Sequence, residues 1–430
     1  MTIIVTLVVV LLFLAIGLPV ALSLVLGGSI GLLVWGGPDL LSGILSTGPG
    51  SAISSYELLT VPMFLLMAEF MVISKISDTL FNAISTWTSR LRGGLGISTA
   101  LTGAAFGAIS GSSTASAATL SISSIPFMIS QGYNRRYASG IVAISGTLAM
   151  LIPPSIAVIL YGLLSGEDIG KLLIAGIIPG ALVGLTIIFT STVQIILKPS
   201  LVPKGYSSSW REKVMSLKVA GPFIILFILV TGLIYLGIAT PVESSAIGAA
   251  GAFIMTLCYG KMGWRNFAFA VVRACMTSAM IGLIIVCAHV YGTFLTMTGA
   301  TQDLIAFVTE SGFHPYVVLA IICALYLMLG CFLDLISIMI LTVPILLPLI
   351  QNLGFNGIWF GMIVILLGEI GIVTPPVGLN VFVVSRATGV PVGEVFSGVW
   401  PHVFSQVLLV ILLIVLPGIV MWVPSHMTGH

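Results

Sequence analysis

The most constraining feature of this sequence is a pair of prolines inside an apolar run that is long enough to cross a bilayer. The run extends from Ile358 to Val384, and Pro375-Pro376 lies within it. Each proline removes a backbone donor and clashes with the preceding turn, so a helix must end near Thr374 and begin again after the pair. At membrane depth, the free backbone groups of such a break are tolerated only where protein or a water-filled cavity surrounds them. The break is therefore a candidate site.

Composition places the chain in a membrane. Hydrophobic residues make up 58% of the sequence and charged residues 7%, with a mean hydropathy of +1.22. Water-soluble globular chains are far more polar. The apolar runs are continuous over about 20 residues, whereas the strands of a membrane barrel would alternate over about 10. The sequence therefore predicts an all-α polytopic membrane protein, and its net charge of +2 gives no indication of a nucleic acid partner.

A second proline pair shows that the break recurs. Pro376 lies 222 residues after Pro154 (376 − 154 = 222), and the same offset relates other prolines and glycines of the two halves. These matches are Pro375 with Pro153, Gly368 with Gly146, Pro348 with Pro126, Pro401 with Pro179, and Gly354-Phe355-Asn356 with Gly132-Tyr133-Asn134. We interpret the chain as two copies of one unit, residues 1–200 and 219–430, joined by a linker at 201–218.

Each copy is predicted to contain five crossings and one additional apolar hairpin. The crossings of the first copy are 2–17, 20–36, 52–75, 137–165 and 172–197, and those of the second are 220–238, 242–260, 266–297, 356–384 and 395–421. The hairpins lie at 93–131 and 313–352, and the crossings at 137–165 and 356–384 contain the breaks. A hairpin returns to the side where it began, so an odd number of crossings inverts the second copy relative to the first.

Charge placement gives an independent reason to expect this inversion. In the five-plus-five arrangement the basic loops share one side, which the positive-inside rule makes cytoplasmic, and both termini lie on the opposite, periplasmic side. The linker could form an amphipathic helix on the cytoplasmic surface or a plain connecting helix. No Lys or Arg precedes Lys75, so the first apolar segment is expected to be retained and not cleaved as a signal peptide.

The hairpins and breaks predict an ion-coupled anion site. The first hairpin has a polar centre at Ser110–Ser116, which suits the tip of a re-entrant hairpin, and the offset aligns Asp334 with Ser112 (334 − 222 = 112). A half-helix that ends at mid-membrane offers carbonyls to a cation, and one that begins there offers amides to a carboxylate. We therefore expect an organic anion that moves with Na⁺.

Ionisable residues within membrane segments are functional candidates by default. Asp334 at the second hairpin tip is the strongest of them. Glu369, before the second break, and Glu243, after Pro241, could be functional or could be structural carboxylates at helix ends. Glu69, Arg273 and His289 fit packing or interfacial roles better. The sequence has no complete phosphate-binding loop and no zinc-protease motif, so we expect neither an enzyme nor a protein that uses ATP.

Several motifs together resemble the large membrane subunit of tripartite ATP-independent periplasmic (TRAP) transporters. They are the Gly-Ser-Ser-Thr-Ala-Ser-Ala stretch from Gly111, Arg135-Arg136-Tyr-Ala, Ile152-Pro-Pro-Ser155, Ala175-Gly-Ile-Ile-Pro179 and Val373-Thr-Pro-Pro-Val-Gly-Leu-Asn380. The resemblance covers nearly the whole chain. It implies a scaffold and a transport domain that move by an elevator mechanism in the bacterial inner membrane. It also implies a small four-helix membrane subunit, a periplasmic binding protein, and an organic acid substrate such as a sialic acid or a C4-dicarboxylate.

The resemblance also suggests roles for individual residues. Two or more Na⁺ ions are expected, one at the second tip and break and another at the first tip and break. The Na⁺ ligands would be Gly330, Asp334, Gly371, Thr374 and Val377 at the second unit, and Ser110, Ser112 and the carbonyls from Thr147 to Ile152 at the first. The substrate would contact Ser113, Thr114, Ser155 and Asn380.

Three other functions stay open at this stage. A sodium and dicarboxylate symporter of the same superfamily would need no binding protein. A gated anion channel would keep one continuous path, whereas inverted broken repeats indicate alternating access. A purely structural membrane subunit would have no use for two polar breaks.

Overall fold

The computed structural model describes residues 2–427 except 75, 204, 206–208 and 260–261, and these residues form helices and loops without a strand. The first half contains α1 (Thr2–Ala15), α2 (Val20–Ile53), α3 (Thr60–Ile73), α4 (Ile76–Thr88), α5 (Gly94–Ser110), α6 (Ser113–Ser130), α7 (Arg135–Ser145), α8 (Ile156–Ser165), α9 (Ile169–Ala175) and α10 (Ile177–Leu197). The second contains α11 (Trp210–Tyr235), α12 (Pro241–Cys258), α13 (Trp264–Met297), α14 (Ala300–Glu310), α15 (Pro315–Gly330), α16 (Leu335–Asn352), α17 (Gly357–Gly371), α18 (Leu379–Thr388), α19 (Val392–Val415) and the short α20 (Gly418–Met421).

Helix boundaries in the two halves follow the sequence offset closely. Adding 222 to the ends of α6, Ser113 and Ser130, gives 335 and 352, which are the ends of α16. The same addition to Arg135, where α7 begins, gives 357, where α17 begins. The helices α4 and α14, and α5 and α15, correspond within one or two residues at their first positions. Matched prolines and glycines therefore mark matched helix ends.

The halves differ before the hairpins. In the first half, the 34 residues of α2 form two helical segments that meet at a kink at Gly37, whose φ of 79° and ψ of −178° are not helical, directly before Pro38. In the second half, α12 ends at Cys258, and α13 then continues from Trp264 without interruption for 34 residues. The predicted crossing at 20–36 coincides with the first segment of α2, which ends at the Gly37 kink. The predicted crossing at 52–75 begins later, with the 3₁₀ turn Tyr56–Leu59 that precedes α3.

The linker ends in a helical segment that is bent relative to the next predicted crossing. The helix α11 extends from Trp210 to Tyr235, and its first part, Trp210–Ser216, is bent by 44° from the part that begins at Ala220. Ser209 caps its first turn in a reciprocal pair with Glu212. Trp87 of α4 donates to Ser216 of α11 at 3.2 Å, which fixes α11 beside α4. The rest of the predicted surface helix, at 204 and 206–208, lies outside the described residues.

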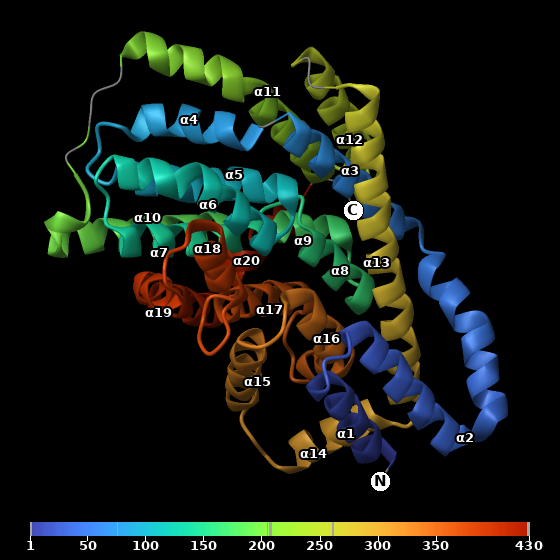
Figure 1. The fold of residues 1–430 in the computed structure, drawn as a ribbon. Coiled ribbons are helices and arrows are strands. Elements are labelled where there is room, and N and C mark those ends of the chain that lie inside the picture. Colours follow the sequence, from blue (N-terminus) through green and yellow to red (C-terminus); the bar gives the residue numbers. More distant parts are fainter. Residues whose placement is uncertain (1, 75, 204, 206–208, 260–261, 428–430) are drawn as a thin grey trace.

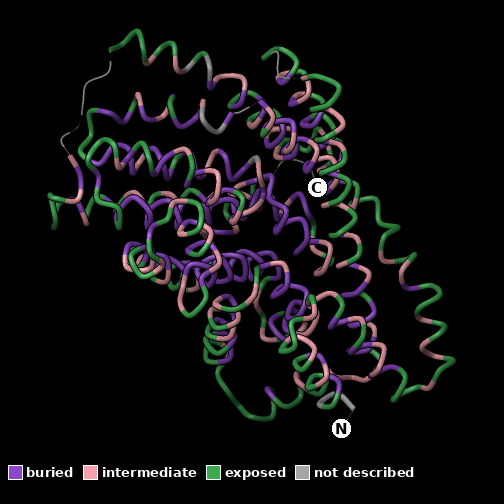
Figure 2. The backbone as a smooth tube through the Cα atoms, viewed as in Figure 1, coloured by how far each residue is buried: buried purple, intermediate pink, exposed green. Residues whose placement is uncertain are grey.

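The broken helices form the centre of the molecule. Figure 1 shows α4, α5, α6 and α10 stacked in nearly the same direction, with the long helices α2 and α13 at one side. Every residue of α17 is buried, as are residues 137–145 of α7, and the buried backbone in Figure 2 gathers around them. A helix that is apolar on all faces must be enclosed by other helices, and this places both breaks inside the protein.

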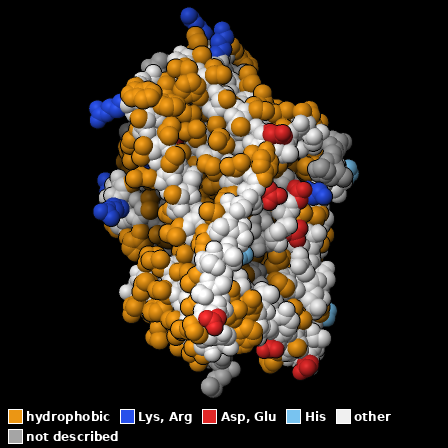
Figure 3. Space-filling view, turned by 90° about the vertical axis from the view of Figure 1, so that its right-hand side faces the viewer, with side chains coloured by type: hydrophobic (Ala, Val, Ile, Leu, Met, Phe, Trp, Pro, Cys, Tyr) orange, Lys and Arg blue, Asp and Glu red, His pale blue; other side chains and the backbone are white. Residues whose placement is uncertain are grey.

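The surface and the helix lengths suit a bilayer. Hydrophobic side chains cover much of the face in Figure 3, where most Lys and Arg lie at the top and left and most Asp and Glu at the right and bottom. Among the described residues, seven helical stretches are long and apolar enough to span a membrane. Six of them lie at predicted crossings, and the seventh is α16, an arm of the second hairpin. Of the four other predicted crossings, α1, which has 14 residues, and the two broken helices are too short to qualify by length, and α11 qualifies only if its two parts, bent by 44°, are taken as one span.

Candidate functional site

Both hairpin tips and both breaks meet at a small cavity. The cavity has a volume of about 120 Å³. Its walls come from the first tip (Ser112, Ser113 and Thr114), the first break (Met150), the second tip (Asp334, Leu335 and Ile336) and the second break (Glu369, Ile372 and Leu379). Five residues singled out from the sequence, Ser112, Ser113, Thr114, Asp334 and Glu369, are therefore brought together here.

The first break closes its own backbone. After α7, a 3₁₀ turn runs from Gly146 to Met150, and the proline pair follows. Thr147 donates its hydroxyl to the carbonyl of Ile144 at 2.7 Å. Ser155 caps α8 by accepting from the amide of Val158 at 3.3 Å, and it donates to the carbonyl of Met150. The hydroxyls of both residues thus satisfy the chain ends at the break, and neither residue lines the cavity.

The second break also bonds its own backbone. Thr374 donates its amide to the carbonyl of Gly371 at 2.9 Å and its hydroxyl to that of Ile370 at 2.6 Å. The amide of Asn380 reaches back to the carbonyl of Ile372 at 3.1 Å. Gly378, the residue directly before α18, has a φ of +65°. The neighbouring Val377 is 36% exposed. The side-chain amide of Asn380 is buried with no partner on either atom within the described structure.

Each tip touches its break through bare backbone. A Cβ on Gly371 would lie 2.5 Å from the Cα of Gly330, and one on Gly330 would lie 2.8 Å from the Cα of Gly371. In the first half, a Cβ on Gly107 would lie 2.6 Å from the Cα of Ala149, the residue equivalent to Gly371 (371 − 222 = 149). Because no side chain fits between them, tip and break present their carbonyls and amides to the same small space.

One hydrogen bond joins the two halves at the cavity. Ser113 of the first tip donates to Oε2 of Glu369 at 2.5 Å, across a separation of 256 residues. The carboxyl group is buried, and its Oε1 has no partner within the described structure. An ionised carboxylate without a counter-charge is costly to bury, so this group must hold either a proton or a nearby cation.

The N-terminal ends of two helices also face this space. Ser112 caps α6 by accepting from the amide of Ala115 at 3.4 Å. Asp334, its equivalent, caps α16 by accepting from the amide of Ser337 at 3.2 Å and from its hydroxyl at 2.5 Å. Amide groups at a helix N-terminus carry a partial positive charge, which suits a carboxylate ligand. Asp334 therefore has a capping role as well as a place in the cavity wall.

Other expected site residues lie outside the cavity wall. Ser110 shares a hydrogen bond with Ser116 at 2.6 Å, which ties the two arms of the first hairpin together. The remaining expected residues belong to the tips and breaks but do not line the cavity; they are Thr147, Ile152, Ser155, Gly330, Gly371, Thr374, Val377 and Asn380. The sequence did not predict the apolar residues of the cavity wall, which are Met150, Leu335, Ile336, Ile372 and Leu379. The offset could have indicated Leu335, because it makes this residue equivalent to Ser113.

Glu243 belongs to a helix cap and not to the cavity. It is exposed at the first turn of α12, where its carboxylate accepts from the amide of Thr240 at 2.8 Å and from its hydroxyl at 2.9 Å. Thr240 in turn accepts from the amide of Glu243, which completes a capping box. Of the two roles that the sequence left open for Glu243, the structure shows the helix-end one, because its carboxylate satisfies the end of its own helix.

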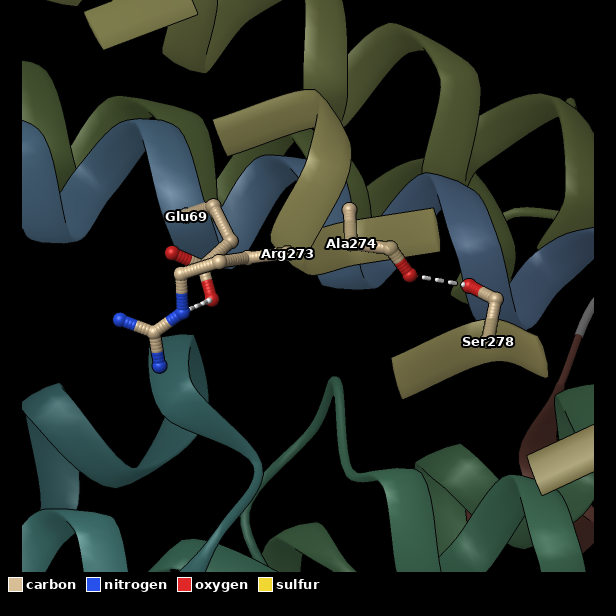
Figure 4. Close-up of polar contacts among 4 residues, drawn as sticks. All are labelled: Glu69, Arg273, Ala274 and Ser278. Carbon is tan, nitrogen blue, oxygen red and sulfur yellow. Dashed lines mark hydrogen bonds and ion pairs between the residues drawn. The ribbon is translucent and has the colours of Figure 1, made fainter. Parts of the chain in front are cut away.

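A separate ion pair joins α3 to α13. The Nε atom of Arg273 lies 3.3 Å from Oε1 of Glu69, as Figure 4 shows, and the outer end of the guanidinium group points away from the carboxylate. The Arg273 side chain is 54% exposed and that of Glu69 is 16% exposed. The pair links two long helices, and neither member lines the central cavity.

Fold and site together define a class of protein. A helical polytopic chain whose hairpin tips and helix breaks enclose a buried cavity has the construction of a secondary membrane transporter. Residues 7–419 match the family described as "Tripartite ATP-independent periplasmic transporter, DctM component". The chain belongs to this family, and it is a subunit of a transporter and not an enzyme.

Curated relatives agree with this class, and a solved structure has a similar fold. The chain is 32% identical over 371 residues to the C4-dicarboxylate TRAP transporter large permease protein of Pseudomonas aeruginosa, covering 86% of each chain. It is 30% identical over 383 residues to the sialic acid TRAP transporter large permease protein of Vibrio cholerae, covering 88% of each. The Alcanivorax borkumensis YdaH transporter has a similar fold, with a TM-score of 0.66 at 13% identity over 98% of this chain and 99% of that one.

Proposed function

We propose that the chain takes up an organic acid anion in symport with Na⁺ across the bacterial inner membrane, with both termini in the periplasm. The observation that supports this most directly is the charge of the cavity wall. Two carboxylates, Asp334 and Glu369, line the cavity, and none of its lining residues is Lys, Arg or His. An anion alone would be repelled there, so an accompanying cation is needed to bring it in. The gradient of that cation, and not ATP, would drive uptake.

The cations would bind where the tips touch the breaks. The Gly330–Gly371 contact brings the backbones of tip and break together, and Asp334 follows on the same tip. Carbonyl and carboxylate oxygens are hard ligands that suit Na⁺. Thr374 and Val377 lie on the same loop, and the equivalent first-half position involves Ser110, Ser112 and the carbonyls from Thr147 to Ile152. In the described part of the chain no three His, Cys, Asp or Glu side chains cluster as a transition-metal site would. We therefore propose two or more Na⁺ ions, held largely by backbone.

The anion would bind on the opposite wall. The N-terminal turns of α6 and α16 supply amide dipoles, and Ser113 and Thr114 supply hydroxyls. Ser155 and Asn380 would be reached when the surrounding helices move apart, since both are fully buried here. The relatives named above bear the names of transporters for C4-dicarboxylates and for sialic acid, and we propose a substrate of this general type.

Transport by movement of one domain fits the way in which the helices are grouped. The tips and breaks, with α10 and α19, would form the transport domain, while α1–α3 and α11–α13 would form the scaffold. The helices α4 and α14 connect the groups at equivalent positions of the two halves. In such an elevator the anion and its cations cross together, because the cavity is enclosed within the moving part.

Two partner proteins are expected from the family. Its description is that of a component of a tripartite system, so we propose that the chain works with a small membrane subunit of four helices and a periplasmic binding protein. The binding protein would deliver substrate to the periplasmic side. The small subunit would cover part of the exposed apolar surface of the scaffold.

Uptake into liposomes tests the proposal. The chain, co-purified with its small subunit, would be reconstituted and given labelled succinate or sialic acid, with and without a Na⁺ gradient and the binding protein. We expect uptake of one anion that requires both. Uptake that persists when both are removed would contradict the symport and the tripartite assignment. Uptake that needs Na⁺ but no binding protein would favour the simpler dicarboxylate symporter, and flux at channel rates would favour a gated anion channel.

A further inference from the structure

A second, larger hollow lies away from the central cavity, between α10 and α19. Its volume is about 630 Å³. Phe189, Val193 and Leu197 form one wall, and Phe404 and Leu408 form the other. Residues four apart lie on the same face of a helix, so each wall is a continuous apolar stripe. We refer to this hollow as the α10–α19 groove.

The groove opens to the outside of the protein. Phe189, Leu197 and Phe404 are 69%, 74% and 66% exposed. From Phe189 to Lys198 the groove follows α10 for nine residues, which corresponds to about 14 Å. This length and the apolar walls suit a hydrocarbon chain. They do not suit the small hydrophilic anion proposed for the central cavity.

One end of the groove is cationic. Arg136, in the first turn of α7, and Lys198, after the last turn of α10, both line it and both are exposed. Arg136 donates one N–H to the carbonyl of Ser397 at 2.9 Å, which holds its guanidinium group at the groove. Arg92 donates to the carbonyl of Pro199 at 2.8 Å, which brings a third cation beside Lys198. The positive-inside rule places these residues on the cytoplasmic side.

Backbone contacts beneath the groove connect it to the first break. A Cβ on Gly140 of α7 would lie 2.3 Å from the carbonyl carbon of Gly398 in α19, and Gly398 lines the groove. The helix α7 leads directly to the break at residues 151–155. Because α7 and α19 are in direct backbone contact here, a ligand in the groove would hold these two helices together.

We propose that the α10–α19 groove binds an anionic phospholipid, with the phosphate between Arg136 and Lys198 and one acyl chain along the apolar walls. Basic pockets between membrane helices on the cytoplasmic side are a recognised setting for anionic headgroups. The complementarity is twofold, because the cations lie at the end of the groove that faces the headgroups and the apolar stripes extend from there toward the bilayer interior.

Lipid binding to the purified protein tests the headgroup contact. Native mass spectrometry would compare phosphatidylglycerol with phosphatidylcholine for the wild type, Lys198→Gln, and the Arg136→Gln/Lys198→Gln pair. Each cation lost should weaken phosphatidylglycerol binding about fivefold, and the pair about 25-fold, with little change for phosphatidylcholine. The matched control, Lys218→Gln/Arg386→Gln, removes the same charge elsewhere on the predicted cytoplasmic side and should keep wild-type binding. Equal losses in both pairs would overturn the assignment.

A second pair of variants tests the acyl chain. Val193→Trp would fill the groove, whereas Ile196→Trp places the same side chain on the exposed face of α10 outside it. We expect phosphatidylglycerol binding and its increase of the melting temperature to be lost in the first and kept in the second. Equal binding in the two would exclude the groove. The same melting increase with inorganic phosphate alone would show an ion site, and crosslinking of Phe404→Cys to the small subunit would show a protein occupant; either would overturn the proposal.

Discussion

The two tip-and-break units share a backbone but differ in chemistry. The first unit, with its tip at Ser110–Ser116 and its break at 151–155, is rich in hydroxyls that satisfy its own chain ends. The second carries both cavity carboxylates: Asp334 is equivalent to Ser112, and Glu369 to Thr147 (369 − 222 = 147). Inverted repeats supply equivalent helix ends, and the side chains at those ends then divide the work of binding between the halves. We expect cation selection to depend mainly on the second unit.

The largest effect is expected at the closest contact of the second unit. Gly371→Ala would place a methyl group 2.5 Å from the Cα of Gly330, so the tip must separate from the break. Overpacking of this kind costs about 1–3 kcal/mol or more, and we expect uptake to fall at least tenfold. Gly393→Ala, whose Cβ would meet nothing within 4 Å, is the control for helix propensity. Normal uptake by Gly371→Ala would show that the tip and break need not touch.

Removing the charge at the second tip should change Na⁺ dependence. Asp334→Asn keeps a residue that can cap α16 but removes the carboxylate from the cavity. We expect the Na⁺ concentration for half-maximal uptake to rise about tenfold, which corresponds to about 1.4 kcal/mol. Asp168→Asn makes the same change at the N-cap of α9, outside the cavity, and should leave Na⁺ dependence unaltered. If Ser112→Ala raised the Na⁺ concentration for half-maximal uptake as much as Asp334→Asn, cation selection would not depend mainly on the second unit.

The hydrogen bond between the units should contribute to stability. Ser113→Ala leaves Oε2 of Glu369 buried without its donor, which costs about 1–3 kcal/mol. The melting temperature in detergent would fall accordingly. Ser123→Ala on the same helix removes a bond to the carbonyl of Thr119 and should change stability by less than about 0.5 kcal/mol. Equal melting temperatures for the two variants would show that the hydrogen bond between Ser113 and Glu369 does not contribute to stability.

The smallest effect is expected for a carboxylate outside both units. Glu243→Ala breaks the capping box of α12 and should cost about 0.5–1 kcal/mol of stability without changing Na⁺ dependence. Glu212→Ala, in the other capping box, should behave in the same way. A shift of the Na⁺ response in Glu243→Ala alone would mean that this charge acts on the transport site, which its position on an exposed helix end does not indicate.

The sequence was sufficient to predict the helical class, the two breaks and the pairing of equivalent positions. These features depend on local constraints. A proline pair interrupts any helix that contains it, and continuous apolar runs leave the chain no other place than a bilayer. The offset of 222 also makes Asp334, at the second hairpin tip, equivalent to Ser112 at the first.

The tertiary structure decided which of the polar residues face one another. Ser113 and Glu369 are 256 residues apart, and their hydrogen bond depends on how two hairpins pack against two breaks. In the structure Ser155 caps its own helix, Glu243 belongs to a capping box, and Gly37 separates the two segments of α2. A sequence pattern records the period and the end of an element, but the direction of a side chain depends on the packing around it. For that reason the hairpin tips and helix breaks were predictable, whereas the side chains that line the cavity between them were not.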